Sequence, residues 1–268
     1  MSHVDAIALV PAWNEAERIG ATVTALRGLP EVAEVLVVSD GSTDATAARA
    51  LEAGAHCLEL THNHGKGDAL NAGLAALMTR VAEGVTPEPR ALLLADADLA
   101  ETAAGLRALL RPVLGGEADV AVADLPPQPG AGGFGLAMGL ARWGMERATG
   151  RRLSEPLSGQ RALRWSALPL LIPFAPGFGV EVAMTVDALR AGLRLVEVEV
   201  DLRHAASGRD LAGLLHRGRQ AGAIARELAR RQAWRRRDGQ RPAALPPAPG
   251  VGGSDGRDRQ RPGGGKQR

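Results

Sequence analysis

Short apolar runs that end in polar residues alternate with helical patterns through the first 100 residues, and this alternation limits the possible folds most strongly. The clearest run is 91–95, which Asp96 and Asp98 follow directly. An apolar run before two acids is typical of a buried parallel strand that ends at a functional edge. Ligands bind at that edge in open α/β sheets. Two aspartates placed there can face one hard divalent cation, directly or through water.

The spacing of strands and helices predicts right-handed βαβ units and a parallel sheet. Asn14, with Glu17 three residues later, is the expected N-cap of the first helix. Strands are predicted at 7–11, 35–39, 55–60, 92–95, 119–124 and 195–202. Helices are predicted at 14–26, 44–54, 69–82, 101–114, 136–148, 181–191 and 211–231, with loops at 125–135 and 150–161.

Two common phosphate-binding fingerprints are missing from the sequence. No Gly-x-Gly-x-x-Gly follows the first strand, and no Gly-Lys-Ser/Thr P-loop occurs anywhere. Polar side chains instead stand at successive strand ends, where parallel topology directs them into one crevice. These residues are Asn14, Glu15, Asp40, Lys66, Asp96 and Asp98.

The basic character of the chain belongs to its C-terminal tail. From Arg235 onward there are nine Lys or Arg against three Asp or Glu, so a whole-chain charge of +2 leaves about −4 for the body. A body without a basic face, with no Tyr and little Phe, argues against a nucleic-acid enzyme. The tail, 233–268, is rich in Gly, Pro and Arg, and we expect it to be disordered.

The sequence predicts a cytoplasmic protein. Its start lacks a basic segment, and Pro11 breaks the first apolar stretch, which is unlike a signal peptide. No stretch reaches the roughly 18 to 20 apolar residues of a transmembrane helix. The single Cys57 excludes an internal disulfide. Contact with the inner face of the membrane through the basic tail, and a homodimer, remain open.

Four motifs resemble, in order and spacing, the nucleotide-sugar glycosyltransferases of family 2 with the GT-A fold. They are Val-Pro-Ala-Trp-Asn-Glu at 10–15, Val-Ser-Asp-Gly-Ser-Thr-Asp at 38–44, Gly-Lys-Gly-Asp-Ala-Leu-Asn at 65–71 and Asp-Ala-Asp at 96–98. The resemblance implies a Rossmann-like, mixed but mainly parallel sheet flanked by helices. It implies one domain at 1–232, with a nucleotide-binding half at 1–100 and an acceptor half at 101–232.

Two branches of that family resemble the downstream sequence. Glu-Pro-Leu-Ser-Gly-Gln-Arg at 155–161 resembles the dolichyl-phosphate mannose synthase branch, which usually has Gln where this chain has Ala100. Pro-Gly-Phe-Gly-Val-Glu at 176–181 and Thr-Gly-Arg at 149–151 resemble the glucosyl-3-phosphoglycerate synthase branch. That branch also places a metal-binding histidine where His204 stands, and it is the better match.

The resemblance implies a role for each candidate residue, against a structural alternative such as a helix cap, a turn aspartate or a surface charge. Donor binding falls to Pro11, Ala12, Asn14, Glu15, Asp40, Lys66 and Asp96. Acceptor binding falls to Gly150, Arg151 and Arg161. Asp96, Asp98 and His204 would hold Mg²⁺ or Mn²⁺, and Asp98, Glu155 and Glu181 are the catalytic candidates.

The expected function is metal-dependent transfer of a hexose from a UDP- or GDP-sugar to an acceptor, such as a small phosphorylated acid like 3-phosphoglycerate. Three alternatives remain. A polyprenyl-phosphate glycosyltransferase would work at the membrane surface. A sugar-phosphate nucleotidyltransferase would release pyrophosphate. A nucleotide-sugar binding protein would not catalyse transfer, and the intact metal, base and phosphate residues count against it.

Overall fold

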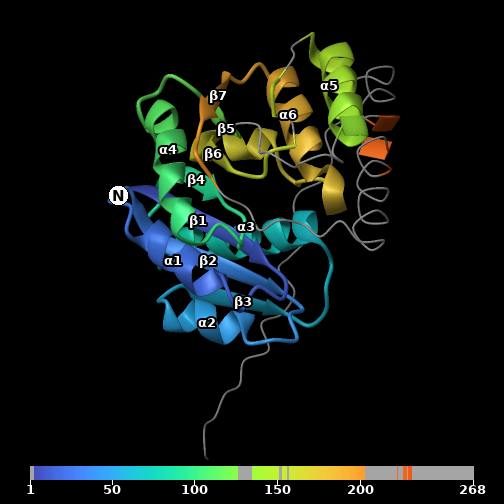
Figure 1. Cartoon of the computed structure of the whole chain (residues 1–268). Helices are drawn as coiled ribbons and strands as arrows, with labels where there is room; N and C mark the ends of the chain where they lie inside the picture. Colours follow the sequence, from blue (N-terminus) through green and yellow to red (C-terminus); the bar gives the residue numbers. More distant parts are fainter. Residues whose placement is uncertain are drawn as a thin grey trace, which may run out of the picture.

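A seven-stranded sheet forms the centre of the molecule (Figure 1). The structure is a computed structural model that describes residues 3–125, 135–150, 153–155, 157–202, 222, 226–227 and 229–230. The strand order is β3-β2-β1-β4-β6-β5-β7, and β6 alone among them runs antiparallel to both of its neighbours. The strands are β1 (Val4–Ala12), β2 (Val32–Asp40), β3 (His56–Leu60), β4 (Pro89–Leu94), β5 (Val120–Asp124), β6 (Arg161–Arg164) and β7 (Leu195–Glu199).

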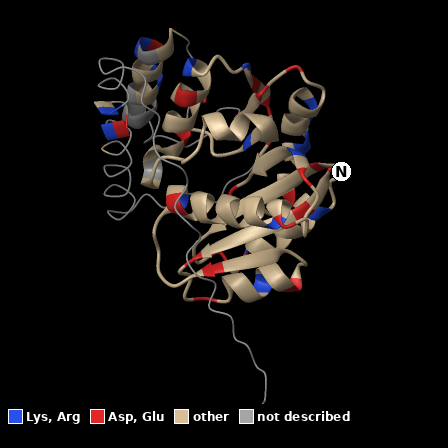
Figure 2. Cartoon of the chain, turned by 180° about the vertical axis from the view of Figure 1, so that it is seen from behind, with Lys and Arg blue, Asp and Glu red and all other residues tan. Residues whose placement is uncertain are grey.

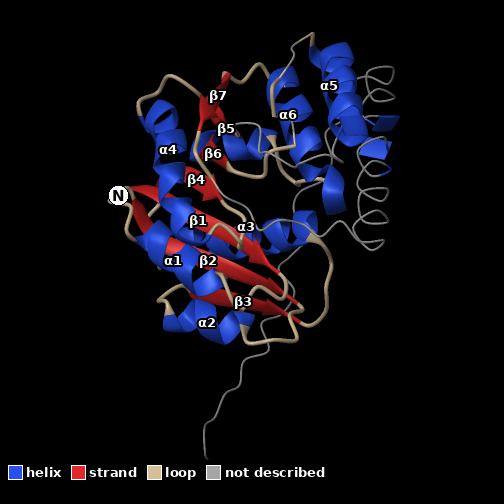
Figure 3. Cartoon of the chain, in the orientation of Figure 1, coloured by secondary structure: helices blue, strands red, loops and turns tan. Residues whose placement is uncertain are grey.

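Helices cover both faces of this sheet (Figure 3). The α-helices are α1 (Ile19–Arg27), α2 (Thr46–Glu52), α3 (Lys66–Ala82), α4 (Arg107–Leu114), α5 (Gly135–Thr149) and α6 (Val180–Arg190). Three 3₁₀ helices join them: η1 (Ala100–Leu106), η2 (Trp165–Leu170) and η3 (Gly177–Gly179). The buried side chains of α1, α2, η1 and α4 pack on one face, and those of α3, α5 and α6 pack on the other.

Alternation along β1 shows how the sequence builds the two core layers. Ile7 and Leu9 belong to the layer under α3, whereas Ala8 and Val10 belong to the layer under α1. All four are fully buried, because a parallel strand in the middle of the sheet has helices on both faces. The mixed, mainly parallel sheet expected from the sequence is confirmed.

The element ends differ from the sequence prediction at three places that matter for the site. The first helix begins at Ile19 rather than at Asn14, whose φ of 55° is left-handed and cannot continue a helix. The third helix begins earlier than predicted, at Lys66, which puts that lysine on its first turn. The stretch predicted as one helix over 101–114 divides into η1 and α4.

Strand β6 is absent from the predicted strands, because it begins at the last residue of the loop predicted at 150–161 and is too short to give a clear local pattern. It has only four residues, and arginines stand at both of its ends. It pairs with β4 and β5, and Ala162 and Leu163 fill the core on opposite faces. Tertiary pairing therefore overrides a weak local signal.

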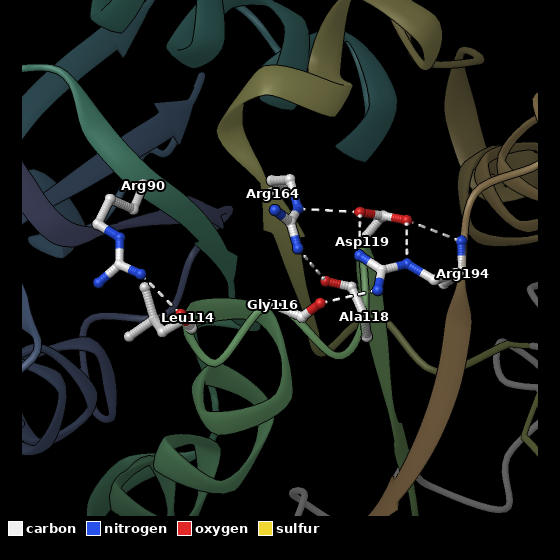
Figure 4. Close-up of polar contacts among 7 residues, drawn as sticks. All are labelled: Arg90, Leu114, Gly116, Ala118, Asp119, Arg164 and Arg194. Atoms are coloured by element: carbon white, nitrogen blue, oxygen red, sulfur yellow. Dashed lines mark hydrogen bonds and ion pairs between the residues drawn. The ribbon is translucent and has the colours of Figure 1, made fainter.

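Two arginines and Asp119 join the amino ends of β5 and β7 to the carboxyl end of β6 (Figure 4). Arg164 Nε lies 2.9 Å from Asp119 Oδ1, and Arg194 Nε and Nη2 each donate to the same carboxylate at 3.1 Å. Hydrogen bonds from Arg194 lower the pKa of Asp119. Both guanidinium groups also donate to backbone carbonyls, of Ala118 and Gly116. This network explains why so short a strand as β6 holds its place.

Positions of acidic and basic residues are interspersed along the described ribbon when the molecule is seen from behind (Figure 2). No helix in the described part of the chain has the length and apolarity to cross a membrane. The predicted last helix at 211–231 lies mostly outside the described residues, and the tail from 233 onward lies entirely outside them.

Candidate active site

Neighbouring parallel strands bring the predicted residues to one edge of the sheet. Strands β2, β1 and β4 are adjacent, and their carboxyl ends lie together. Pro11 and Ala12 close β1, and Asp40 closes β2. Asp96 and Asp98 follow β4. Pairing with β1 continues one residue past the end of β4, because the Ala95 amide donates to Leu9 O at 3.2 Å.

Hydrogen bonds between backbone amides and side chains join the loops that follow β1 and β2. Asn14 Oδ1 accepts from the Thr43 amide at 2.8 Å, and the Asn14 amide donates to Ser42 Oγ at 3.1 Å. The next amide, of Glu15, donates to Thr46 Oγ1 at 2.8 Å. Asn14 therefore organises the loop that the sequence assigned to the donor, and it does not cap α1.

Glu15 lies where negative charge accumulates. Partial burial raises its pKa, the nearby charges of Asp98 and Asp44 raise it further, and Arg18, with Nε 3.2 Å from Glu15 Oε2, opposes the shift. Because Asp98 acts on Glu15 electrostatically, these two carboxylates belong to the same corner of the site. Such a concentration of negative charge attracts a divalent cation.

Asp40 is almost fully buried and shapes the loop that leads into α3. Its Oδ1 accepts from the His64 amide at 2.9 Å, and its Oδ2 accepts from the Gly65 amide at 2.7 Å. A carboxylate oxygen can accept more than one hydrogen bond, so these contacts leave acceptor capacity for a ligand. The role of Asp40 in binding the nucleobase and ribose of the donor stays a prediction.

Lys66 joins two carboxylates that come from distant parts of the chain. Its Nζ lies 2.6 Å from Asp96 Oδ1 and 2.8 Å from Glu181 Oε1. Burial acts to lower the pKa of Lys66, but the charges and hydrogen bonds of the two carboxylates outweigh it and raise this pKa above the ordinary value. The predicted loop lysine is thus a fixed, charged group between the end of β4 and the first turn of α6.

Segment 158–161 closes this cluster from the side of β6. Gln160 Nε2 donates to Asp96 Oδ2 at 2.8 Å, whereas Lys66 contacts the other carboxylate oxygen, Oδ1. A Cβ atom added at Gly159 would lie 2.3 Å from Lys66 Nζ and 3.0 Å from Asp96 Oδ1. Neither Gly159 nor Gln160 was predicted as a site residue, although both belong to the motif at 155–161.

Arg161 requires a correction to the role expected for it. Its side chain is fully buried, so it exposes no donor to an acceptor in this structure. Its Nε donates to Ser158 O at 2.9 Å, and its Nη1 donates to Thr185 Oγ1 at 2.8 Å. The physical reason is the position of Arg161 at the start of the inner strand β6, which carries the guanidinium beneath α6.

Glu155 lies in a second polar cluster, formed by the ends of β5 and β7. Arg142 Nη2 is 3.8 Å from its carboxylate, and its amide donates to Glu197 Oε1 at 3.1 Å. Partial burial raises the pKa of Glu155, Arg142 opposes this, and the charges of Asp124 and Glu197 add to it. A carboxyl group with a raised pKa can act as a general base.

Three predicted residues take no part in the contacts described above. Gly150 follows α5 with a φ of 73°, a left-handed conformation that glycine adopts without strain. Arg151 and His204 lie outside the described residues. Within the described ranges, no group of three or more His, Cys, Asp or Glu side chains could hold a metal ion by itself. The predicted metal set of Asp96, Asp98 and His204 stays a prediction.

The carboxylates present suit a hard divalent cation. Asp96 and Asp98 supply oxygen ligands, which Mg²⁺ and Mn²⁺ prefer. Asp98 lies near the carboxyl group of Glu15, whose pKa is raised mainly by partial burial and further by the charges of Asp98 and Asp44. Lys66 adds a positive group that can meet phosphate oxygens. The site can accordingly hold an anion and its counter-cation at the same edge of the sheet.

A family model described as glycosyl transferase family 2 matches residues 7–158. Glucosyl-3-phosphoglycerate synthase of Mycolicibacterium paratuberculosis is 30% identical over 220 residues, covering 73% of this chain and 64% of the relative. The chain thus spans somewhat less than two thirds of that relative's length. Glycosyltransferase AglJ of Haloferax volcanii is 30% identical over 233 residues, covering 83% of this chain and 70% of the relative.

Solved structures show the same fold. Glucosyl-3-phosphoglycerate synthase from Mycobacterium tuberculosis, in complex with Mn²⁺, UDP and glucosyl-3-phosphoglycerate, superposes with a TM-score of 0.68 at 26% identity. That match covers 85% of this chain and 80% of the other. The complex of the same enzyme with Mg²⁺ and UDP gives a TM-score of 0.68 at 25% identity, with 85% and 79% covered.

Proposed function

Because the chain belongs to glycosyl transferase family 2, we propose that it transfers a hexosyl group from UDP-glucose or a related nucleoside diphosphate sugar to 3-phosphoglycerate or a similar small phosphorylated acid. Mg²⁺ or Mn²⁺ is the proposed cofactor. The observation that carries the proposal is Lys66 bridging Asp96 and Glu181 at the edge where β4 ends. Lys66 is the proposed phosphate-binding cation, Asp96 the proposed metal-binding acid and Glu181 the proposed sugar-binding acid, and each acid contacts the lysine directly.

The donor diphosphate is assigned to the space beside Asp98 and Lys66. Asp98 and Asp96, with His204, would hold the cation, which as a Lewis acid neutralises the leaving diphosphate. Lys66 adds positive charge to the same leaving group, and its rigid placement means that little reorganisation is needed as the bond to the sugar breaks.

The base and the sugar are assigned to opposite sides of that diphosphate. Pro11, Asn14 and Asp40, on β1 and β2, would line the base and ribose pocket. Glu181, at the start of α6, would accept hydrogen bonds from hexose hydroxyls, since its carboxylate already faces Lys66. The sugar then lies between the nucleotide half and the acceptor half of the chain.

The proposed acceptor rests on similarity and on one structural feature. The similar enzyme of Mycolicibacterium paratuberculosis is named a glucosyl-3-phosphoglycerate synthase, and the solved complex of the Mycobacterium tuberculosis enzyme contains glucosyl-3-phosphoglycerate. In this chain Glu155, with its raised pKa, lies in the polar loop where the acceptor is predicted to enter. Gly150 and Arg151 remain predicted acceptor ligands, since Arg forks suit phosphate and carboxylate groups.

The proposal is tested by incubating the purified protein with UDP-glucose, Mn²⁺ and 3-phosphoglycerate, and measuring free UDP and the glucosylated acid by mass spectrometry. GDP- and ADP-glucose are the parallel donors. A polyprenyl phosphate in detergent is included as a second acceptor, because the motif at 155–161 resembles the dolichyl-phosphate mannose synthase branch.

The products separate the alternatives. Release of a nucleoside diphosphate with a glycosylated phosphorylated acid supports the proposal. If the hexose is transferred only to polyprenyl phosphate, the proposed phosphorylated acid is the wrong acceptor and polyprenyl phosphate takes its place. Pyrophosphate formed from a nucleoside triphosphate and a sugar phosphate would overturn the reaction type. Omitting the metal is the internal control, and it should abolish nucleoside diphosphate release.

A further inference from the structure

Arg161 is a buried cation whose contacts lead to Glu181 through α6. The guanidinium has no exposed surface. Its Nε is held by Ser158 O at 2.9 Å, which fixes the plane of the group, and its Nη1 donates to Thr185 Oγ1 at 2.8 Å. A buried guanidinium must satisfy its donors within the protein, because leaving them unpaired costs several kcal/mol.

Thr185 connects that guanidinium to the first turn of α6. Its side chain is also fully buried, and its hydroxyl donates to Glu181 O at 2.9 Å while it accepts from Arg161. Residues four apart lie one above the other on a helix. The chain of contacts therefore ends on the peptide group of Glu181, the residue that carries the site carboxylate.

The charges along this path alternate in sign. The Glu181 carboxylate lies 2.8 Å from Lys66 Nζ, and its side chain is only 12% exposed. Burial lowers the pKa of Arg161 to about 10, and the negative charge of Glu181 opposes that shift. Glu181 is thus held between a cation in the site and a cation beneath the helix.

We propose that Arg161 and Thr185 are positioning residues that fix Glu181 in the donor-sugar part of the site, without touching substrate themselves. The inference rests on the proposed function, in which Glu181 binds the hexose. Loosening the first turn of α6 should displace the contact with the sugar. The proposed base and ribose pocket lies on β1 and β2, and Lys66 keeps its own contact with Asp96, so the affinity for UDP should not change.

The experiment compares Thr185→Val, which removes the hydroxyl at nearly constant volume, with Thr185→Ser, which retains it. Steady-state kinetics with UDP-glucose and 3-phosphoglycerate give kcat/KM, and calorimetry gives the Kd of free UDP with Mn²⁺. We expect Thr185→Val to lower kcat/KM about 10-fold or more, because misplacement of a binding group is costly in rate. The UDP Kd should stay within 2-fold, and Thr185→Ser should recover most of the activity.

Two further variants separate positioning from general stability. Thr86→Val removes another buried threonine hydroxyl, which bonds Glu34 at 3.4 Å, and it should leave kcat/KM within 2-fold. In a Glu181→Gln background, Thr185→Val should add little, because both changes affect one contact. If the valine variant does not fold, Thr185→Cys replaces it, because a thiol is a weaker acceptor for Arg161 Nη1 and a weaker donor to Glu181 O but does not leave the guanidinium wholly unpaired.

The inference is overturned if Thr185→Val keeps wild-type kcat/KM, if UDP affinity falls in parallel with it, or if its effect is fully additive with Glu181→Gln. A wild-type protein that turns over no sugar nucleotide would instead overturn the proposed function, and this inference with it. An active wild type with an unaffected Thr185→Val variant overturns the positioning role alone.

Discussion

Lys66 Nζ lies 2.6 Å from Asp96 Oδ1, although thirty positions separate the two residues. Asp40 accepts a hydrogen bond from the Gly65 amide and so holds the loop from which α3 begins at Lys66. Asp96 follows β4, and its carboxylate meets the lysine there. A second carboxylate, Glu181, reaches the same ammonium at 2.8 Å. One cation therefore links three elements at the edge where ligands bind in such sheets.

Lys66→Met should remove the charge and leave Asp96 and Glu181 facing each other unscreened. We expect kcat to fall about 100-fold or more, since losing one preorganised group on a leaving anion costs that much. The measurement is the rate of UDP release from UDP-glucose. Arg90→Met removes an exposed cation that pairs with Asp5 at 3.0 Å, and this control should keep wild-type activity. Equal rates for the two variants would contradict the assignment of Lys66.

Gly159→Ala should push Lys66 away from Asp96, because the added Cβ would lie 2.3 Å from Lys66 Nζ. We expect kcat/KM to fall about 10- to 100-fold, as a displacement of about 1 Å in a site does. Gly139→Ala is the matched control, since nothing lies within 4 Å of a Cβ added there in α5. That control should keep activity and gain about 0.5 kcal/mol of stability. An active Gly159→Ala variant would show that the close approach is not required.

Asn71→Ala should weaken the attachment of α3 to the segment that leads into α6. The Asn71 amide donates to Phe174 O at 2.9 Å and accepts from the Phe174 amide at 2.8 Å. Leaving these backbone groups unpaired costs about 1 to 3 kcal/mol of unfolding free energy. Urea unfolding measures the loss, and Thr79→Ala on the exposed side of the same helix should cost much less. Equal losses would show that the Phe174 contacts carry no stability.

Glu155→Gln should stabilise the protein at neutral pH while lowering its activity. Burial raises the pKa of Glu155 in the folded state, so the charged form costs stability above that pKa, and the cost vanishes once the pH falls below the unfolded value. The melting temperature of the variant should exceed that of the wild type at pH 7.5, and the difference should shrink toward pH 4. A variant that is less stable at pH 7.5 would contradict the role of burial. Full activity would remove Glu155 from the catalytic candidates.

The sequence predicted the edge of the sheet where the polar residues gather, because apolar runs and the acids after them are local signals. Asp40 and Asp96 lie where the strand pattern required. The contacts of Lys66 with Asp96 and Glu181 could not be predicted from the sequence, since they depend on how α3 and α6 pack.

Arg161 shows the limit of residue type as a guide. The sequence suggested an exposed fork for an acceptor, whereas pairing of β6 between β4 and β5 buries the guanidinium under α6. Asn14 shows the same limit for local patterns: its spacing to Glu17 resembles a helix cap, yet its bond with the Thr43 amide joins two loops. In both cases long-range contacts decide the conformation.

The most direct measurement for the whole account is metal-dependent turnover of UDP-glucose by Asp98→Ala in the presence of 3-phosphoglycerate. Asp5→Ala, an exposed acid at the opposite end of β1, is the control, and melting curves check that both variants fold. We predict that Asp98→Ala melts as a folded protein and releases no UDP with either Mn²⁺ or Mg²⁺, while Asp5→Ala behaves as the wild type. Wild-type UDP release by folded Asp98→Ala would contradict the account.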